Sequence, residues 1–344
     1  MSMRIRLCAA AVAAVLGVAV TACSGGGETS PDQAQATTAS PRPAQTASGS
    51  VWVADEAGNS LTVIDAATNA VTTTVAGLTE PHNVQIGRDG ATVYAVSGSD
   101  NLVVAIDAAT YKVQAVAPTG PAPAHVIDAP NGKIYVTNSG DGTVSVYQGP
   151  GLQPTGRITL GDMPHGLRPA AGGSVIVVAN TMAGTLDLID PVTDNLLGVV
   201  RVGAGPAQVA VTADGRYAYA GITDPPAVVK ADLVARTVVG TAKVPTAPVQ
   251  VYLTPDEATV LSADQGTRDA PGRTVSMLDT AAMAVRSTVA TGSGPHGVVI
   301  DTAGTRAWVT NTYDNTVSVI DLPTASVIAT VPTGTAPSGI SYSP

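Results

Sequence analysis

Four histidines are the residues of this chain best suited to chemistry, and their sequence surroundings are alike. His82, His165 and His296 directly follow a proline, and His125 follows one at a distance of two residues. Neutral imidazole is a common protein ligand of zinc, copper, iron and nickel, so three or four converging imidazoles could bind one such ion. The histidines are therefore candidate metal ligands, provided that the fold brings them together.

The histidines recur because the sequence itself repeats, with a period of about 42 residues. The clearest copies are Ile-Tyr-Val-Thr-Asn at 134–138 before Thr-Val-Ser-Val at 143–146, and Trp-Val-Thr-Asn at 308–311 before Thr-Val-Ser-Val-Ile-Asp at 316–321. Short alternating strands at such a period are typical of β-propeller blades. Small β-branched residues dominate them and the chain has no Phe, which suits tightly stacked sheets.

The repeats predict an all-β fold, a seven-bladed β-propeller with four-stranded antiparallel blades, whose strands we name A to D from the axis outward. The first blade begins out of phase, with strands B, C and D at 51–54, 61–65 and 71–75. Complete sets are expected to begin near Asn83, His125, Gly166, Gln208, Gln250 and Gly297. A last strand A at 338–342 would pair with the N-terminal strands and close the ring, which removes exposed sheet edges.

Two recurring positions have an expected structural role. Apolar residues at one place in strand A should pack between blades; these are Val84, Val126, Leu167, Val209, Val251, Val298 and Ile340. An aspartate recurs at the end of strand C, at Asp65, Asp107, Asp190, Asp232, Asp279 and Asp321. We expect each carboxylate to cap the turn that follows, rather than to join a ring of carboxylates.

The Tyr-Val-Thr-Asn strand, the Val-Ile-Asp strand and the Gly-x-x-Pro-His-Gly link resemble the YVTN β-propeller repeat family over residues 51–344. That family includes surface-layer and secreted propellers, and its wider relatives include lactonases and cofactor-dependent oxidoreductase domains. The resemblance is specific for the fold and much less specific for an activity, because function is grafted on such scaffolds.

All four histidines are expected in the links between strands D and A, which surround one mouth of the central channel. Other blades carry Gln208, Gln250 or Ser338 near this place, and these could hydrogen-bond to the histidines. Pro-His-Gly is also common in the resembling family, where the ring can simply bond to a neighbouring blade's backbone. The sequence leaves three roles open: a structural one, a metal site, and docking of an organic ligand or partner.

One loop between strands B and C, at residues 265–273 in blade six, is several residues longer than its equivalents. These loops should rim the same face as the histidines. An added loop beside a channel mouth is a common way to gain a partner contact, so Arg268, Asp269 and Arg273 are candidate contact residues. A neutral insertion is the alternative interpretation.

The N-terminus is typical of an exported lipoprotein. Residues 1–22 combine Arg4 and Arg6 with an apolar run, as a signal peptide does, and the Val-Thr-Ala-Cys ending resembles a bacterial lipobox that would leave Cys23 lipidated. Residues 23–50 are rich in Ser, Gly, Pro and Thr and predict a disordered linker before the propeller at 51–344. We expect lipid anchoring to the outer face of the bacterial cytoplasmic membrane or to the cell surface.

The charge pattern argues against nucleic acid as a partner. The formal net charge is −9, about −11 without residues 1–22, and the basic residues are scattered rather than gathered in a stripe. The sequence has no Gly-x-Ser-x-Gly elbow, phosphate-binding loop or haem-attachment motif. A closed ring has no edge that requires another chain, so we expect a monomer.

These observations favour a non-enzymatic scaffold that binds a small-molecule ligand or a protein partner through its histidine-bearing mouth. A metal-dependent enzyme, of lactonase-like hydrolase or lyase type, is the first alternative, and an accessory protein for metal handling or periplasmic redox chemistry is the second. An enzyme would need the histidines with a metal. Asp55, Glu56 and Asp264 lie near that face and could act as acid or base, but we expect them to be turn or surface residues.

Overall fold

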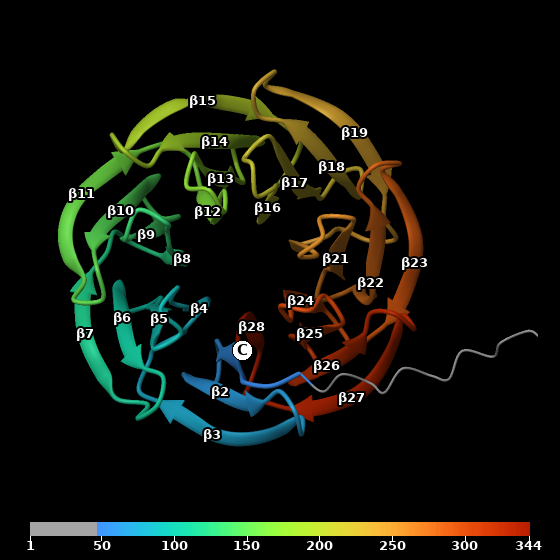
Figure 1. Ribbon diagram of the computed structural model, residues 1–344, viewed down its shortest axis with the longest axis horizontal. Helices are drawn as coiled ribbons and strands as arrows, with labels where there is room; N and C mark the ends of the chain where they lie inside the picture. Colours follow the sequence, from blue (N-terminus) through green and yellow to red (C-terminus); the bar gives the residue numbers. More distant parts are fainter. Residues whose placement is uncertain (1–46) are drawn as a thin grey trace, which may run out of the picture. The chain divides into compact units, whose positions relative to one another are not determined.

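The computed structural model describes residues 47–344, which form a closed ring of seven four-stranded antiparallel sheets (Figure 1). The predicted signal peptide, Cys23 and nearly all of the predicted linker lie outside the described residues. Within 47–344, no helix is long and apolar enough to span a membrane. Ala47 already packs into the core between the first and last blades, and Ala66 N–H donates to the carbonyl of Gly49.

Each blade contains strands A to D from the axis outward, and we number the blades in chain order. Blade 1 contains β28 (Pro337–Ser343), β1 (Ser50–Asp55), β2 (Ser60–Asp65) and β3 (Ala70–Ala76). Blade 2 contains β4 (Val84–Ile86), β5 (Thr92–Ser97), β6 (Leu102–Asp107) and β7 (Val113–Pro118). Blade 3 contains β8 (Pro123–Asp128), β9 (Lys133–Asn138), β10 (Thr143–Gln148) and β11 (Gln153–Thr159).

The other blades follow the same plan. Blade 4 contains β12 (Pro164–Pro169), β13 (Ile176–Asn180), β14 (Thr185–Asp190) and β15 (Asn195–Arg201). Blade 5 contains β16 (Val209–Val211), β17 (Tyr217–Ile222), β18 (Ala227–Asp232) and β19 (Thr237–Lys243). Blade 6 contains β20 (Gln250–Leu253), β21 (Thr259–Gly266), β22 (Pro271–Asp279) and β23 (Ala284–Ala290). Blade 7 contains β24 (Pro295–Ile300), β25 (Arg306–Asn311), β26 (Thr316–Asp321) and β27 (Ser326–Pro332).

The ring is closed by strands from both ends of the described chain, as the sequence predicts. β28 pairs antiparallel with β1, with Val51 opposite Tyr342 and Val53 opposite Ile340. Because β28 takes the innermost place in blade 1, no blade lacks a strand and no long sheet edge is exposed at the junction.

Both recurring positions have their predicted roles. Each of the seven apolar residues of strand A is buried, in a cluster that joins two neighbouring blades. Each recurring aspartate accepts backbone N–H groups of the turn after strand C; Asp65, for example, accepts from Ala67 and Thr68 at 3.0 and 2.7 Å. These carboxylates therefore cap turns and do not form a site.

The Thr-Asn pair of the repeat motif holds neighbouring strands together. Thr137 at the end of β9 accepts the N–H of His125 and donates to the carbonyl of His165 in the next blade. Asn138 points the other way and donates to Thr143 and Ser145 on β10, at 2.9 and 3.0 Å. The threonine thus fixes the backbone beside two of the histidines.

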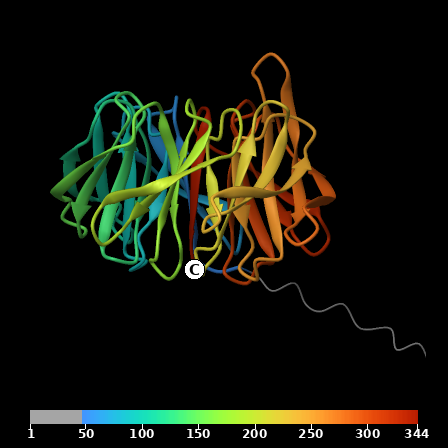
Figure 2. The same cartoon turned by 90° about the horizontal axis from the view of Figure 1, so that it is seen from above.

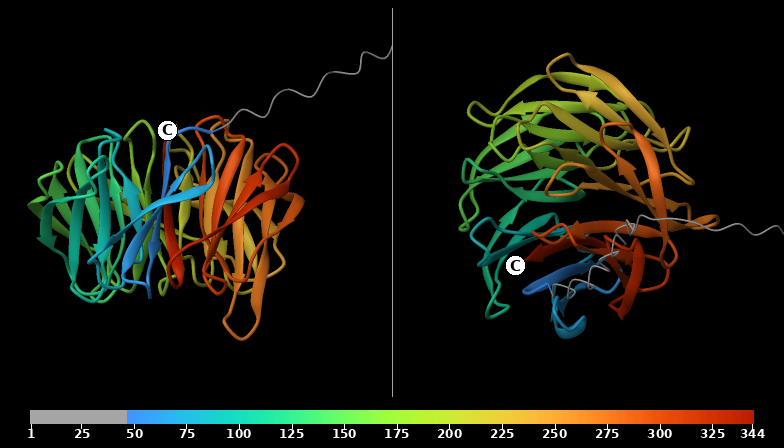
Figure 3. Two further views of the ribbon diagram at one scale, coloured as in Figure 1. Left: turned by 90° about the horizontal axis from the view of Figure 1, so that it is seen from below. Right: turned by 45° about the vertical axis from the view of Figure 1, so that its right-hand side comes forward.

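The strand register defines two faces of the ring. Pro337 at the start of β28 lies opposite Asp55 at the end of β1, so the B–C turns and the beginnings of the A strands share one face, which we call the histidine face. Ser50 lies opposite Ser343, so the chain enters the propeller at the other face. Figures 2 and 3 show the long orange β21–β22 hairpin at one face and the C-terminus at the other.

Candidate functional site

Strand A positions the histidines, one from each of four blades. His82 lies two residues before β4, His125 in β8, His165 in β12 and His296 in β24. Three of the four are therefore inside strand A and not in the link before it, contrary to our expectation. The reason is a bulge: Pro164 already pairs with Asn180 before the register shifts ahead of Leu167.

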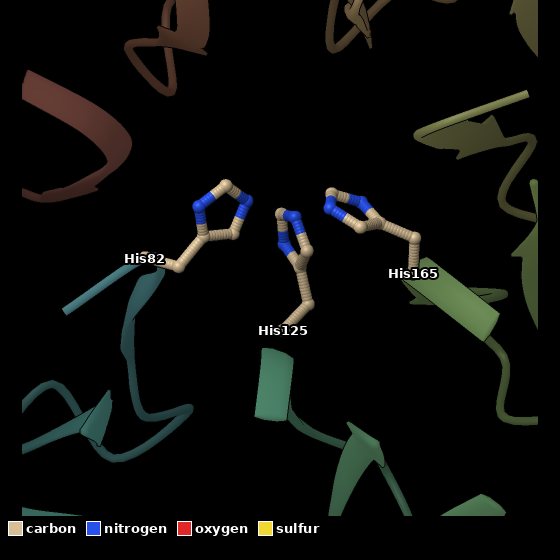
Figure 4. A group of neighbouring side chains, drawn as sticks. All are labelled: His82, His125 and His165. Carbon is tan, nitrogen blue, oxygen red and sulfur yellow. The ribbon is translucent and has the colours of Figure 1, made fainter. Parts of the chain in front are cut away.

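Three of the rings converge (Figure 4). One ligating nitrogen from each of His82, His125 and His165 can be chosen so that all lie within 4.8 Å of one another. The ring centroid of His82 is 5.4 Å from that of His125 and 5.1 Å from that of His165. His296 joins the group from the other side, with its centroid 5.6 Å from that of His82.

A carboxylate orients His82. Its Nδ1 lies 3.0 Å from Oε2 of Glu56, at the start of the turn between β1 and β2. An ionised carboxylate only accepts, so Nδ1 carries the proton and Nε2 keeps its lone pair. That Nε2 atom is buried and has no hydrogen-bond partner within residues 47–344. This pairing of a carboxylate with an imidazole is common behind metal-ligating histidines.

A backbone carbonyl orients His165 in the same way. Its Nδ1 donates to the carbonyl of Ala207 at 2.9 Å, which leaves Nε2 as the lone-pair nitrogen. The next residue, Gly166, donates its own N–H to the same carbonyl at 2.8 Å. A Cβ at Gly166 would lie 2.3 Å from Oε1 of Gln208, so the glycine of Pro-His-Gly is what lets the neighbouring blade approach.

Gln208 contacts His125. Its Oε1 accepts the N–H of Val209 at 2.9 Å, which leaves its Nε2 to donate to Nδ1 of His125 at 3.2 Å. His125 therefore carries its own proton on Nε2. To ligate through Nδ1, His125 would have to exchange the Gln208 donor for a metal ion.

Burial keeps three of these imidazoles neutral. Desolvation, reinforced by the nearby His82 imidazole, lowers the pKa of His165 to about 4 and that of His296 to about 3. Desolvation also takes the pKa of His125 well below its ordinary value. Burial opposes ionisation of Glu56, but the hydrogen bond from His82 and the electrostatic effect of the nearby imidazoles outweigh this, so the pKa of Glu56 is lowered. Neutral imidazole is the form that binds metal ions.

A hollow of about 510 Å³ opens beside His82 and His165 on the histidine face. Its wall includes Glu56 and Glu80 together with the B–C turns of blades 1 to 3. These turns and the histidines thus share one face, and the ring nitrogens lie next to a space that a small ligand could enter.

Other candidate residues have different surroundings. Gln250 donates to the carbonyl of Val298 at 3.3 Å and makes no bond to a histidine ring. Ser338 donates to the backbone carbonyl of His82 at 2.8 Å and so supports its main chain. Asp55 and Asp264 are fully buried near the ends of β1 and β21, and both accept hydrogen bonds from hydroxyl groups. The turn or surface role expected for them is therefore wrong.

The long loop of blade 6 lies against blade 7. The guanidinium of Arg268 is 5.2 Å from the centre of the Tyr313 ring, and Arg273 Nη1 is 3.9 Å from Oδ2 of Asp314. Asp269 at the tip is exposed and has no side-chain contact within the described residues. The two arginines are thus in contact with their own chain.

Two residues near the axis were not identified as site residues from sequence. Glu56 is expected from the sequence to be a turn or surface residue. Its place in the first B–C turn, on the predicted histidine face, is the only sequence signal for its contact with His82. Arg168 lies three residues beyond His165 on β12, and an arginine inside strand A is a signal that the sequence does contain.

Comparisons with known proteins agree on the fold. The solved structure of hydrazine synthase from Kuenenia stuttgartiensis is 21% identical, with a TM-score of 0.70, and the match covers 77% of this chain and 90% of that chain. The solved structure of a functionally unknown protein from Desulfotomaculum acetoxidans is 14% identical, with a TM-score of 0.73. That match covers 86% of this chain and 99% of the other. At such identities the likeness shows the fold alone.

No curated protein is significantly similar to the chain. The model of the YNCE-like β-propeller family matches residues 114–221, from blade 2 into blade 5. The chain is thus a seven-bladed β-propeller, and its residues 114–221 are similar to the YNCE-like β-propeller family.

Proposed function

We propose that the protein is an exported binding scaffold whose histidine face holds a transition-metal ion. The observation that carries the proposal is the convergence of His82, His125 and His165, whose chosen ligand atoms lie within 4.8 Å of one another. Two of these rings also present an Nε2 lone pair, because Glu56 and the carbonyl of Ala207 hold their Nδ1 protons.

The donor set suits a borderline metal ion. Imidazole nitrogens bind zinc, copper, iron or nickel, and general affinity trends place copper first among these divalent ions. Bonds of about 2.0–2.1 Å place tetrahedral ligand atoms roughly 3.3 Å apart, so the three rings would move inward on binding. Three protein ligands leave a coordination position free on the side of the hollow, where a water molecule or a small ligand would complete the set.

Elemental mass spectrometry on the full chain, purified without added metal and then incubated with each ion, tests this proposal. We expect near-stoichiometric metal in the wild type and none in the double variant His82→Ala/His165→Ala. His296→Ala is the matched control, because it removes a neighbouring imidazole that is not in the converging set. Circular dichroism should show that all three proteins are folded. A wild type that stays metal-free after incubation with all four ions would overturn the metal site.

We also propose that Cys23 carries a lipid that anchors the protein at the membrane surface. The apolar run of residues 1–22 and the Val-Thr-Ala-Cys ending at Cys23 support this proposal. Cys23→Ser should move the protein from the membrane fraction to the soluble fraction. A wild type without lipid mass at Cys23 would contradict the proposal.

A metal-dependent hydrolase or lyase is a second candidate, favoured by the hollow of about 510 Å³ beside His82 and His165. A bound metal ion would polarise a carbonyl or activate a water molecule there. Turnover of simple lactones by the metal-loaded wild type, lost in His82→Ala/His165→Ala, would support it. Stoichiometric metal without turnover, with transfer of the ion to an acceptor protein, would instead support an accessory role in metal handling.

A further inference from the structure

A second cluster of polar groups lies at the other end of strand A. Arg168 is on β12, three residues beyond His165, and burial lowers the pKa of its guanidinium. Its Nη1 donates to the carbonyl of Leu167 at 3.1 Å. Among residues 47–344 no carboxylate lies within 4 Å of it. A guanidinium has five N–H groups, so most of its donor capacity is unused by the protein.

Arg168 borders a hollow of about 350 Å³ on the face opposite the histidines. The hollow lies between the A strands of blades 4, 5 and 6. The side chains of Tyr252 and Arg88 lie on its wall. Apolar side chains, among them Val211 and Leu253, form much of the remaining surface. Ligand pockets in proteins have volumes of roughly 300–1,000 Å³, so the space suits a small organic molecule.

Arg168 is half-buried, so its guanidinium loses part of its hydration while it makes a single hydrogen bond to the protein. Arg168 is not balanced by the acidic residues of this surface. The nearest acidic wall residue, Glu257, accepts the backbone N–H of Ala213 at 2.5 Å. An anion in the hollow would supply the missing counter-charge and accept the free guanidinium protons.

We propose that this hollow binds a small organic monocarboxylate, with its head group on Arg168 and its apolar body against Val211 and Leu253. The planar guanidinium fork matches the two oxygens of a carboxylate. The apolar wall favours an organic ligand over a fully hydrated inorganic anion. The wall carries two positive charges, on Arg88 and Arg168, and one negative charge, on Glu257, so its net charge of about +1 favours a singly charged ligand.

Titration of benzoate into the full chain, followed by ligand-detected NMR in the presence of a chelator, tests this site. We expect saturable binding at millimolar concentration or below. Benzyl alcohol has the same apolar body without the charge and should bind about 10-fold more weakly or less. Arg168→Gln should weaken benzoate binding by about 10-fold or more, because a charged hydrogen-bonding partner is lost.

Arg216→Gln is the matched protein control, because this exposed arginine lies outside the hollow and is already 3.6 Å from Asp232. Arg168→Lys keeps the charge without the fork and should give an intermediate affinity, which also serves if Arg168→Gln does not fold. The double variant His82→Ala/His165→Ala should bind benzoate normally, so the two sites are tested separately. Inorganic phosphate is titrated in the same way for comparison. Equal affinities of the wild type and Arg168→Gln for benzoate, no saturable binding of benzoate, or tighter binding of phosphate than of benzoate would overturn the proposal.

Discussion

The protonation pattern of the histidines follows from what each Nδ1 atom meets. The carboxylate of Glu56 and the carbonyl of Ala207 can only accept, so His82 and His165 direct unprotonated Nε2 atoms toward the axis. The amide of Gln208 instead donates to His125 and leaves the opposite tautomer. His125 lies one residue further from its proline than His82 and His165 do, and it has the opposite proton arrangement.

Glu56→Gln should weaken metal binding without unfolding the protein. The amide can still accept the His82 proton, but it loses the charge that makes the imidazole more basic. Loss of such a partner typically lowers metal affinity about 10- to 100-fold. Competition with a chelator of known affinity measures the change, and Glu80→Gln is the matched control, because Glu80 lines the same hollow but bonds to Ser99. Equal losses in both variants would argue that only the general charge of the face matters.

Asp264→Asn should stabilise the protein at neutral pH. Burial raises the pKa of Asp264 from 3.8 to about 6, even though Ser262 and Ser276 donate to it. The folded state therefore holds the proton more tightly than the unfolded state. Stability contributed by the protonated form is complete below about pH 4 and is lost as the pH rises through about 6, a loss of up to roughly 3 kcal/mol. Asn138 and Asn311 occupy the same place in blades 3 and 7 without this cost.

Urea unfolding at pH 5 and pH 7 measures this effect. The variant should gain about 1–2 kcal/mol on the wild type at pH 7 and less at pH 5. Asp269→Asn, at an exposed loop tip, removes the same formal charge and should leave the pH dependence unchanged. A gain that is the same at both pH values would show that ionisation of Asp264 is not the cause.

At the scale of strands and loops, most of the strands and their local contacts could be predicted from the sequence. The period predicts the strands. The apolar position of strand A recurs in all seven blades, the turn aspartate in six and the Thr-Asn pair in blades 3 and 7, and each makes the same local contact wherever it recurs. The long loop was also visible as an insertion, but its contacts were not, since Tyr313 and Asp314 come from the next blade. Contacts across blades depend on side-chain directions that a repeat pattern does not encode.

Replacing residues 267–270 by Asn-Gly should shorten the β21–β22 hairpin and leave both the fold and the metal content unchanged. The two strands still pair at Gly266 and Pro271, and Asn-Gly favours a two-residue turn. Loss of the exposed Arg268–Tyr313 contact should cost about 0.5–1 kcal/mol, read by thermal unfolding. Arg268→Ala alone should reproduce that cost. Reduced metal content in the shortened protein would show that the loop supports the histidine site.

At the scale of the whole molecule, the site depends on the ring being closed. The seven blades and the place of the last strand followed from counting repeats, because each unit needs four strands. The convergence of the histidine side chains could not be predicted from the repeats. It depends on the width of the central channel and on bulges at the start of β8 and β12. Ser338 shows the dependence directly: it belongs to β28, yet it holds the main-chain carbonyl of His82 in blade 2.

Deleting residues 337–344 should therefore damage both stability and metal binding. The truncated chain exposes the inner edge of β1, which favours association between molecules, and it loses the hydrogen bond from Ser338 to His82. The separate packing contribution can be measured with Ile340→Ala, which should cost about 2–5 kcal/mol because Ile340 is buried between the first and last blades. The truncation should have a larger effect than Ile340→Ala on thermal unfolding, light scattering and metal content. Deletion of Pro344 alone is the control and should affect none of the three. A truncated chain that stays monomeric and keeps its metal would mean that the ring does not need β28 to hold the histidines in place.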